Sequence, residues 1–317
     1  MTNSNGFFLI SLDFESMWGS IGSKDYNGFV ERTKYEREII AGILERFKKH
    51  QIHSTWGIVG AMACHSKEEA IKLNPNNIHY PEWNVDTHQI IDNATSEYFL
   101  SDLVLNVSTL PYTEIASHTF THVYFKNPCV TEEDATKELE LSKKVLSNYG
   151  DVNTVIFPRN QIDDCKIRLL NECGYNIYRG TITRLFRNNK YFEFLNCYLP
   201  ISKKTSYPIS TIKAIEGVYN IPASMFLRFY NKKLKVFEKL KLNRIKREMK
   251  RSAEKHLVFH LWFHPHNLGT NLEKNFAILD NLLNYFDFLK SKYDYKSVNI
   301  NELKTLLQTK EIINETL

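Results

Sequence analysis

The sequence lacks a long hydrophobic run and a regular cysteine pattern. No stretch of its 317 residues approaches the roughly 18 uncharged residues that a membrane-spanning helix needs, so we expect no transmembrane segment. The five cysteines are odd in number, widely spaced and without a Cys-x-x-Cys pair, which favours reduced thiols over a disulfide framework. Residues 1–6 lack the basic region and apolar core of a secretory signal. Together these absences predict a cytoplasmic protein.

What is present is the composition of an ordinary globular protein, with 43% hydrophobic and 24% charged residues. A chain of this length can form one α/β barrel or two smaller domains. No internal repeat and no clear linker divides it. We therefore expect a single domain over residues 1–317.

Short apolar segments alternate with segments of helical periodicity along most of the chain. The predicted strands are 7–13, 52–56, 114–117, 155–157, 177–179, 215–221 and 257–263, and the predicted helices are 35–50, 131–149, 162–172 and 272–291, followed by a last strand–helix pair at 296–309. Such alternation predicts parallel βα units and a barrel-like sheet. Catalytic groups in barrels of this kind gather at the carboxyl ends of the strands. Asp13, His118, Arg159, Arg179 and His264 all fall at such ends.

The segment His118-Thr119-Phe120-Thr121-His122 is the most informative motif. Two imidazoles at positions i and i+4 project from the same side of a helical turn, which suits one shared metal ion. Such a pair taken alone is weak evidence, because two histidines often meet on a helix by chance. Asp13 and Glu15 strengthen it, since residues i and i+2 of a strand share a face and two buried acids need a metal ion, hydrogen bonds or a proton between them. A loop or cap pair of acids remains the alternative.

A second histidine group ends the strand predicted at 257–263. Strand alternation places His260, Trp262 and His264 on one face, and Pro265 stops the strand so that His264 lies at its tip. Histidines in an aromatic-rich strand are often core residues, but the position of His264 favours a functional role. His266 either flanks the same site or lies in the following loop.

A basic segment at residues 226–255 holds twelve Lys and Arg residues against three acidic ones. Its net charge is +9 while the whole chain carries +5, so the rest of the chain is negative. Its apolar residues recur at helical spacing, which predicts a basic amphipathic helical insertion at about 224–255. This helix either packs on the body with a solvated basic face or contacts an anionic membrane or phosphate-bearing ligand. No nucleic-acid motif accompanies the charge, so we expect no nucleic-acid partner.

The order of these motifs resembles that of the polysaccharide deacetylases, the NodB-like carbohydrate esterases, from about Phe7 to Asn267. The motifs around Asp13 and around His264 are similar to those of a subgroup associated with surface-polysaccharide biosynthesis. The resemblance implies a distorted (β/α) barrel that removes N-acetyl, O-acetyl or related acyl groups from sugars. It also implies a divalent metal ion, most often Zn²⁺, held by one carboxylate and two histidines.

The resemblance implies roles for individual residues. Glu15, His118 and His122 would hold the metal ion, Asp13 would act as the base with Arg159 orienting it, and His264 would act as the acid. The predicted substrate-binding residues are Trp18, Tyr124, Arg179, Trp262 and His266.

Two motifs depart from the family pattern. Phe14 stands where the family has a second aspartate, so Glu15 would replace the missing ligand. The family's Arg-x-Pro order is changed to Pro158-Arg159, and Arg179 is an alternative for the orienting role.

The sequence therefore predicts a metal-dependent deacetylase that acts on a sugar or glycan precursor in the cytoplasm. If the basic helix contacts the inner face of the membrane, a lipid-linked sugar is the expected substrate. The alternatives are a deformylase or cyclic-amide hydrolase of the same fold, and a catalytically inactive glycan-binding relative.

Overall fold

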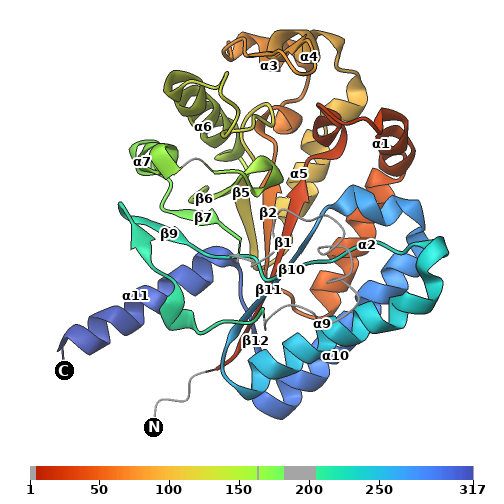
Figure 1. The fold of residues 1–317 in the computed structure, drawn as a ribbon, viewed down its shortest axis with the longest axis vertical. Coiled ribbons are helices and arrows are strands. Elements are labelled where there is room, and N and C mark those ends of the chain that lie inside the picture. The colour runs from red at the N-terminus through yellow and green to blue at the C-terminus, as the bar shows by residue number, and fades with distance from the viewer. Residues whose placement is uncertain (1–4, 163, 182–204, 317) are drawn as a thin grey trace.

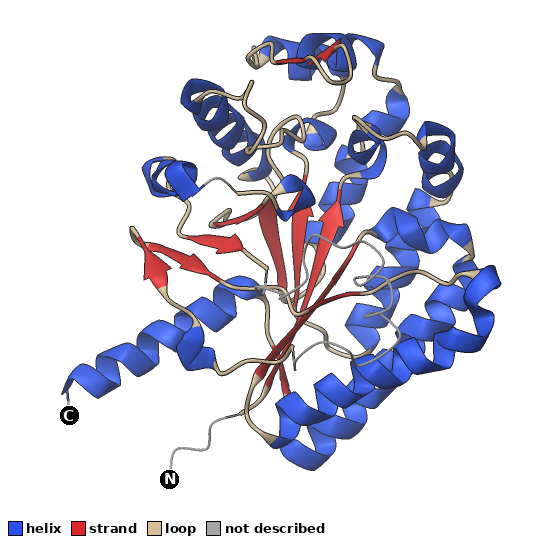
Figure 2. Cartoon of the chain, viewed as in Figure 1, coloured by secondary structure: helices blue, strands red, loops and turns tan. Residues whose placement is uncertain are grey.

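A computed structural model describes residues 5–162, 164–181 and 205–316 as a curled, mostly parallel sheet surrounded by helices (Figures 1 and 2). The sheet has ten strands in the order β10 (Met225–Phe226), β11 (Val258–Phe263), β1 (Phe7–Phe14), β2 (Ser54–Ile58), β5 (Thr113–Ser117), β6 (Thr154–Ile156), β7 (Ile177–Arg179), β9 (Val218–Asn220) and β8 (Ala214–Ile215), with β12 (Lys296–Ser297) also paired to β1. Every pair in this sheet is parallel except β8–β9. This arrangement confirms the predicted distorted (β/α) barrel.

The helices lie outside the strands and return the chain from one strand to the next (Figure 2). They are α1 (Tyr26–Thr33), α2 (Glu36–Lys49), α3 (Lys67–Lys72), α4 (Thr87–Asn93), α5 (Ser101–Ser108), α6 (Glu132–Leu146), α7 (Ile167–Glu172), α9 (Glu238–Glu254), α10 (Leu272–Tyr293) and α11 (Ile300–Thr316). A small hairpin of β3 (His79–Tyr80) and β4 (Val85–Asp86) lies apart from the main sheet. No helix in the described part of the chain is long and apolar enough to cross a membrane.

Strand β1 lies in the interior of the sheet, and all eight of its residues are buried. Its sequence Phe-Phe-Leu-Ile-Ser-Leu-Asp-Phe is the near-continuous apolar run that a parallel strand covered on both faces requires. Its neighbours β11 and β2 run in the same direction on either side. The carboxyl ends of these three strands therefore lie at one edge, where polar side chains leave the core.

Helix α6 begins as predicted from its sequence. The Thr131 hydroxyl accepts a hydrogen bond from the backbone N–H of Asp134, and the Asp134 carboxylate accepts one from the backbone N–H of Thr131. This reciprocal pair is a capping box, which satisfies two backbone donors at the start of the helix.

The basic helix is shorter than its sequence predicts. Met225 and Phe226 pair with β11 as strand β10, and α9 begins only at Glu238. The helical periodicity at the start of the segment wrongly predicts a helix there. Phe226 is apolar because its ring packs against Trp262 of the sheet, and not because it belongs to the apolar face of a helix. A short 3-10 turn, η7 (Lys232–Phe237), connects β10 to α9.

One of the five cysteines that are predicted to be reduced thiols, Cys197, lies outside the described part of the chain. None of the four cysteines within the described residues forms a disulfide bond; they are Cys64, Cys129, Cys165 and Cys173.

Candidate metal centre

Two carboxylates emerge on the same side at the end of β1. Asp13 is the penultimate residue of the strand and Glu15 follows it, while Phe14 between them is fully buried and packs edge-on against Trp56. Strand alternation therefore sends Phe14 into the core and both acids toward the site. This geometry explains how an acid-x-acid sequence presents two carboxylates to one centre.

The two motif histidines lie on a loop after β5, which corrects the predicted helical turn. Thr119 has a φ of 63° and His122 a φ of 62°, so the chain turns twice through the left-handed region. The two imidazole ring centroids nevertheless lie 5.1 Å apart. The predicted proximity is observed, but a tight loop produces it.

Glu138 of α6 holds this loop in place, and the sequence analysis missed it. Its buried carboxylate accepts hydrogen bonds from the backbone N–H groups of Phe120 and Thr121, at 2.8 and 2.7 Å, and from the Thr121 hydroxyl at 2.7 Å. Glu138 stands one residue before the buried Leu139, on the inward face of the helix. An acid on an otherwise apolar stripe was the available signal.

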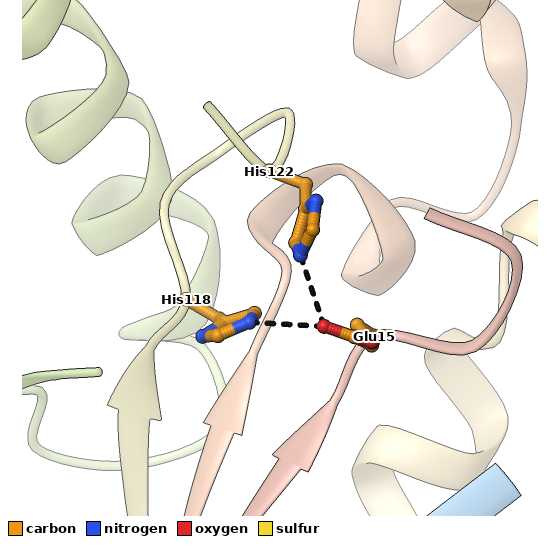
Figure 3. Close-up of side chains that lie close together, drawn as sticks. All are labelled: Glu15, His118 and His122. Atoms are coloured by element: carbon orange, nitrogen blue, oxygen red, sulfur yellow. Dashed lines mark hydrogen bonds and ion pairs between the residues drawn. The ribbon is translucent and has the colours of Figure 1, made fainter. Parts of the chain in front are cut away.

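Glu15, His118 and His122 converge on one point from β1 and from the loop after β5 (Figure 3). The Glu15 Oε2 atom lies 3.2 Å from His118 Nε2 and 2.9 Å from His122 Nε2. All three residues are buried, and their ligand atoms lie within 4.8 Å of one another. One carboxylate and two imidazoles on this scale match the donor set of a catalytic zinc site.

The hydrogen bonding of His118 supports a cation at this point. Its Nδ1–H donates to the backbone carbonyl of Ile156 at 2.6 Å, so in a neutral ring Nε2 carries a lone pair. That lone pair would face the Glu15 carboxylate, which is repulsive unless a cation or a proton lies between them. A carbonyl that orients the second ring nitrogen is also the usual outer contact of a metal-binding histidine.

The charges around the site keep its carboxylate ionised. Burial raises the pKa of Glu15, but the adjacent histidines His264, His122 and His118 oppose this effect and hold the pKa well below the ordinary value. Burial lowers the pKa of His122, although Glu15 opposes this effect. An ionised carboxylate and a neutral imidazole are the forms that bind a metal ion.

Arg179, not Arg159, holds Asp13. The Arg179 guanidinium donates to both Asp13 oxygens, with Nη2 at 2.8 Å from Oδ2, and to Asn160 Oδ1. Arg159 lies instead with its Cζ 4.3 Å from the Tyr124 ring centroid. The contact with Asp13 that the resemblance implies for Arg159 is therefore made by Arg179, the last residue of β7.

Burial and the guanidinium act in opposite directions on Asp13. Burial raises the pKa of Asp13, but the Arg179 charge and its hydrogen bonds outweigh this and lower the pKa below the ordinary value. Arg179, which is also a predicted substrate-binding residue, is 1% exposed, and its guanidinium is occupied by this ion pair.

His264 completes the constellation from the end of β11. Its Nε2 atom lies 3.5 Å from Glu15 Oε1 and 3.8 Å from Asp13 Oδ2, and its side chain is 21% exposed. The half-buried Trp262 lies next to it, with ring centroids 5.6 Å apart. His264 is thus the site residue that faces both the carboxylates and the solvent.

Three of the predicted substrate-binding side chains are core residues. Trp18 is fully buried, and its indole N–H donates to the Tyr98 carbonyl at 2.8 Å, so it has no face open to a sugar. Tyr124 is 3% exposed and donates to the Ile21 carbonyl. His266 is 2% exposed, and burial lowers its pKa to about 3. Of the predicted substrate-binding aromatic residues, Trp262 is the one that is partly exposed.

Glu36, the first residue of α2, is a second buried acid that the sequence analysis missed. Burial raises the pKa of Glu36 to about 8, and the charge of Glu15 acts in the same direction. In the unfolded chain the group returns to about 4.5. Between these values the folded protein binds a proton that the unfolded chain releases, so the free energy of unfolding falls as pH rises through this window.

We expect Glu36→Gln to remove this pH dependence. In the wild type, the ionisation of Glu36 should lower the free energy of unfolding by about 4 kcal/mol as the pH rises from about 5 to about 9. Glutamine is neutral and of similar shape, so the variant should be the more stable protein at the alkaline end. Chemical denaturation at both pH values measures the difference. The matched control is Glu38→Gln on the exposed face of the same helix, and an equal effect there would refute the assignment to burial.

No protein-family model matches the sequence, and a search of curated proteins finds no match. Among solved structures, the chain is similar to one from Mycobacterium smegmatis solved as a suspected polysaccharide deacetylase, with a TM-score of 0.61, 9% identity, and coverage of 98% of this chain and 93% of that one. It is also similar to a 4-α-glucanotransferase from Thermococcus litoralis, with a TM-score of 0.52, 13% identity, and coverage of 95% of this chain and 40% of that one.

A weaker match, with a TM-score of 0.46, 14% identity, and coverage of 95% and 66%, is a pseudoenzyme of carbohydrate esterase family 4 from Bacillus anthracis. At these identities a likeness shows the fold and leaves the activity open. The chain has the distorted (β/α)-barrel fold of the polysaccharide deacetylases.

Proposed function

We propose that this protein is a metal-dependent hydrolase that removes an acetyl group from the nitrogen or oxygen of a sugar in a glycan precursor. The single observation that carries the proposal is the convergence of Glu15, His118 and His122 beside the Asp13–Arg179 pair and His264. The motif around His264 resembles that of enzymes of surface-polysaccharide biosynthesis. This resemblance supports a role in the biosynthesis of a surface polysaccharide and a cytoplasmic location.

Glu15, His118 and His122 would hold the ion, and Zn²⁺ fits two imidazoles and one carboxylate best. When bound, the ion supplies Lewis acidity, which activates water and polarises the acyl oxygen. The three residues approach from β1 and from the loop after β5, which leaves the side toward His264 for substrate.

Asp13 would act as the general base. Its carboxylate is ionised and fixed in orientation by Arg179, so it can accept the proton of the attacking water. A base positioned in this way contributes about 10²–10⁴-fold to the rate. Arg179 does not reach the substrate in this scheme, and it acts through Asp13 as a positioning residue.

His264 would act as the general acid. Its partial exposure places it at the entrance, where its Nε2 atom lies 3.5 Å from Glu15 Oε1 and 3.8 Å from Asp13 Oδ2. A proton from His264 would convert the departing amine or alkoxide into a good leaving group. The neighbouring Trp262 is half-buried, and in this scheme it is the aromatic side chain that a sugar ring would contact.

The decisive test combines metal analysis with acetate release. We expect the purified protein to carry about one equivalent of divalent metal and to release acetate from one member of a panel of N- and O-acetylated sugars. A chelator should abolish release, and Zn²⁺ should restore it. Formate release from formylated sugars without acetate release would establish the deformylase alternative. Glycan binding without any product would establish the inactive alternative and contradict the proposal.

A further inference from the structure

An exposed apolar cluster lies at the start of α9. Within residues 232–240, which we call the tip, Val236 is 79% exposed, Phe237 44% and Leu240 43%. Single exposed apolar side chains are ordinary on a protein surface, and the other large exposed ones in the described part of the chain are dispersed in sequence. Three within five residues form a patch, and an apolar patch in water points to a partner that covers it.

The tip is also strongly basic. Lys232, Lys233, Lys235 and Lys239 are all exposed. The acid of the tip, Glu238, pairs at 2.6 Å with Lys241 on the buried side of the helix, so it does not offset the exposed lysines. Apolar side chains surrounded by lysines have the composition of a surface that lies in the headgroup region of an anionic bilayer.

The tip lies on the same edge of the barrel as the candidate metal centre. Strands β10 and β11 are parallel, so the segment between the end of β10 and the start of α9 is at the carboxyl edge, where His264 also lies. The last residue of β10, Phe226, has its ring 4.6 Å from that of Trp262 and 5.6 Å from that of His264. The chain thus runs from the wall of the site directly to the tip, which reaches the right-hand margin of Figure 1.

We propose that the tip docks this protein onto an anionic lipid membrane. Val236, Phe237 and Leu240 enter the boundary between headgroups and acyl chains, and the four exposed lysines contact the anionic headgroups. Docking through the carboxyl edge brings the entrance of the metal centre close to the bilayer surface. If the proposed deacetylase activity holds, membrane docking assigns sugars carried on a membrane lipid as the substrate class. This assignment rests on the proposed function.

The apolar residues distinguish a membrane from a nucleic acid as the partner. A phosphate backbone is bound by cations and by aromatic or polar side chains that contact bases, and exposed aliphatic groups at the centre of the contact add nothing to it. Val236 and Leu240 are aliphatic, and Val236 is the most exposed of the large apolar side chains in the described residues. A bilayer is the partner that uses both the lysines and the aliphatic groups.

Vesicle flotation tests this proposal without any assay of activity. The full chain is mixed with vesicles of phosphatidylcholine alone or with about one quarter phosphatidylglycerol, a level that gives the surface a negative potential. We expect the protein to float with the anionic vesicles only, and to be partly released by about 0.5 M NaCl, which screens the charges. No flotation with anionic vesicles at low salt, or equal flotation with neutral ones, would overturn the proposal.

Two pairs of variants locate the surface. Lys235→Gln/Lys239→Gln should weaken vesicle partitioning roughly 25-fold, at about fivefold for each charge. Its matched control is Lys48→Gln/Lys49→Gln at the end of α2, on the opposite edge of the barrel. Val236→Ser/Leu240→Ser should weaken it roughly tenfold for each side chain. Its control is Ile71→Ser/Leu105→Ser, which changes two exposed apolar residues elsewhere.

The tip variants should keep the wild-type rate on a water-soluble acetylated sugar, because they leave the metal centre intact. Equal loss of flotation in the tip and control variants would show that binding follows total charge or total apolar surface and would refute a docking site. Tight binding of an oligonucleotide that the tip lysines control, with no vesicle binding, would replace the membrane by a nucleic acid. If flotation holds and no acetate is ever released, the surface stands and the proposed activity fails.

Discussion

Replacement of His118 by alanine is expected to abolish both metal binding and turnover. His118 provides one of the three converging ligand atoms, and its hydrogen bond to the Ile156 carbonyl orients the ring toward the other two. With two ligands left, the ion should dissociate during dialysis. Loss of the ion removes both activation of water and stabilisation of negative charge, so turnover should fall roughly 10³-fold or more.

Metal content by elemental analysis and acetate release on the same sample check this prediction. His65→Ala removes an exposed imidazole outside the site and should change neither quantity. Because His118 is fully buried, His118→Asn provides a more conservative second variant if the alanine protein folds poorly. Unchanged turnover without metal would eliminate the metal scheme, and retained metal with no turnover would move His118 from ligand to another role.

The parts of the site that the sequence predicts are those fixed by strand periodicity. Asp13 and Glu15 share a side because alternate residues of a strand do, and Phe14 between them occupies the core. His264 lies at the same edge because Pro265 ends β11 there. The carboxyl ends of parallel strands lie at one edge of the sheet whatever the strand order. The proximity of these residues can therefore be predicted without the tertiary structure.

The loop of His118 and His122 shows where such reasoning stops. The spacing predicts proximity through a helical turn, whereas the structure achieves it with positive φ values at Thr119 and His122. Non-glycine residues adopt this region only when their surroundings hold them there, and the holding group is Glu138, on a separate helix. Local sequence cannot specify a conformation that a distant carboxylate stabilises.

The choice between Arg159 and Arg179 also depends on tertiary structure. Arg159 follows the short strand β6 and Arg179 ends the short strand β7, and the curvature of the sheet decides which guanidinium reaches Asp13. Glu36 and Glu138 offered a usable signal, since each is an acid on the apolar face of an amphipathic helix. A charged group at such a position is costly unless it is hydrogen-bonded or protonated, and its presence indicates a nearby functional contact.

Arg179→Met is expected to destabilise the protein and to shift the pH dependence of the reaction. The side chain is 1% exposed and pairs with a carboxylate that is 2% exposed, so its removal leaves a buried charge without its partner. Breaking a pair of this kind costs about 3–5 kcal/mol. Because Arg179 lowers the pKa of Asp13 and burial raises it, the pKa of Asp13 should rise in the variant. The base then stays protonated to higher pH, and the acid limb of the kcat/KM profile should move in the alkaline direction.

Arg159→Met is the matched control, because it removes the same charge from the neighbourhood of Tyr124 and leaves the Asp13 pair intact. It should keep the wild-type position of the acid limb. Arg179→Lys keeps a positive charge but not the two-pronged contact, so it should restore most of the pH profile and only part of the stability. An acid limb that moves with Arg159→Met and stays in place with Arg179→Met would return the orienting role to Arg159. A purely structural Arg179 would lower stability and leave the profile unchanged, so the shift of the acid limb is what distinguishes a residue that tunes the base from one that only holds β7 against β1.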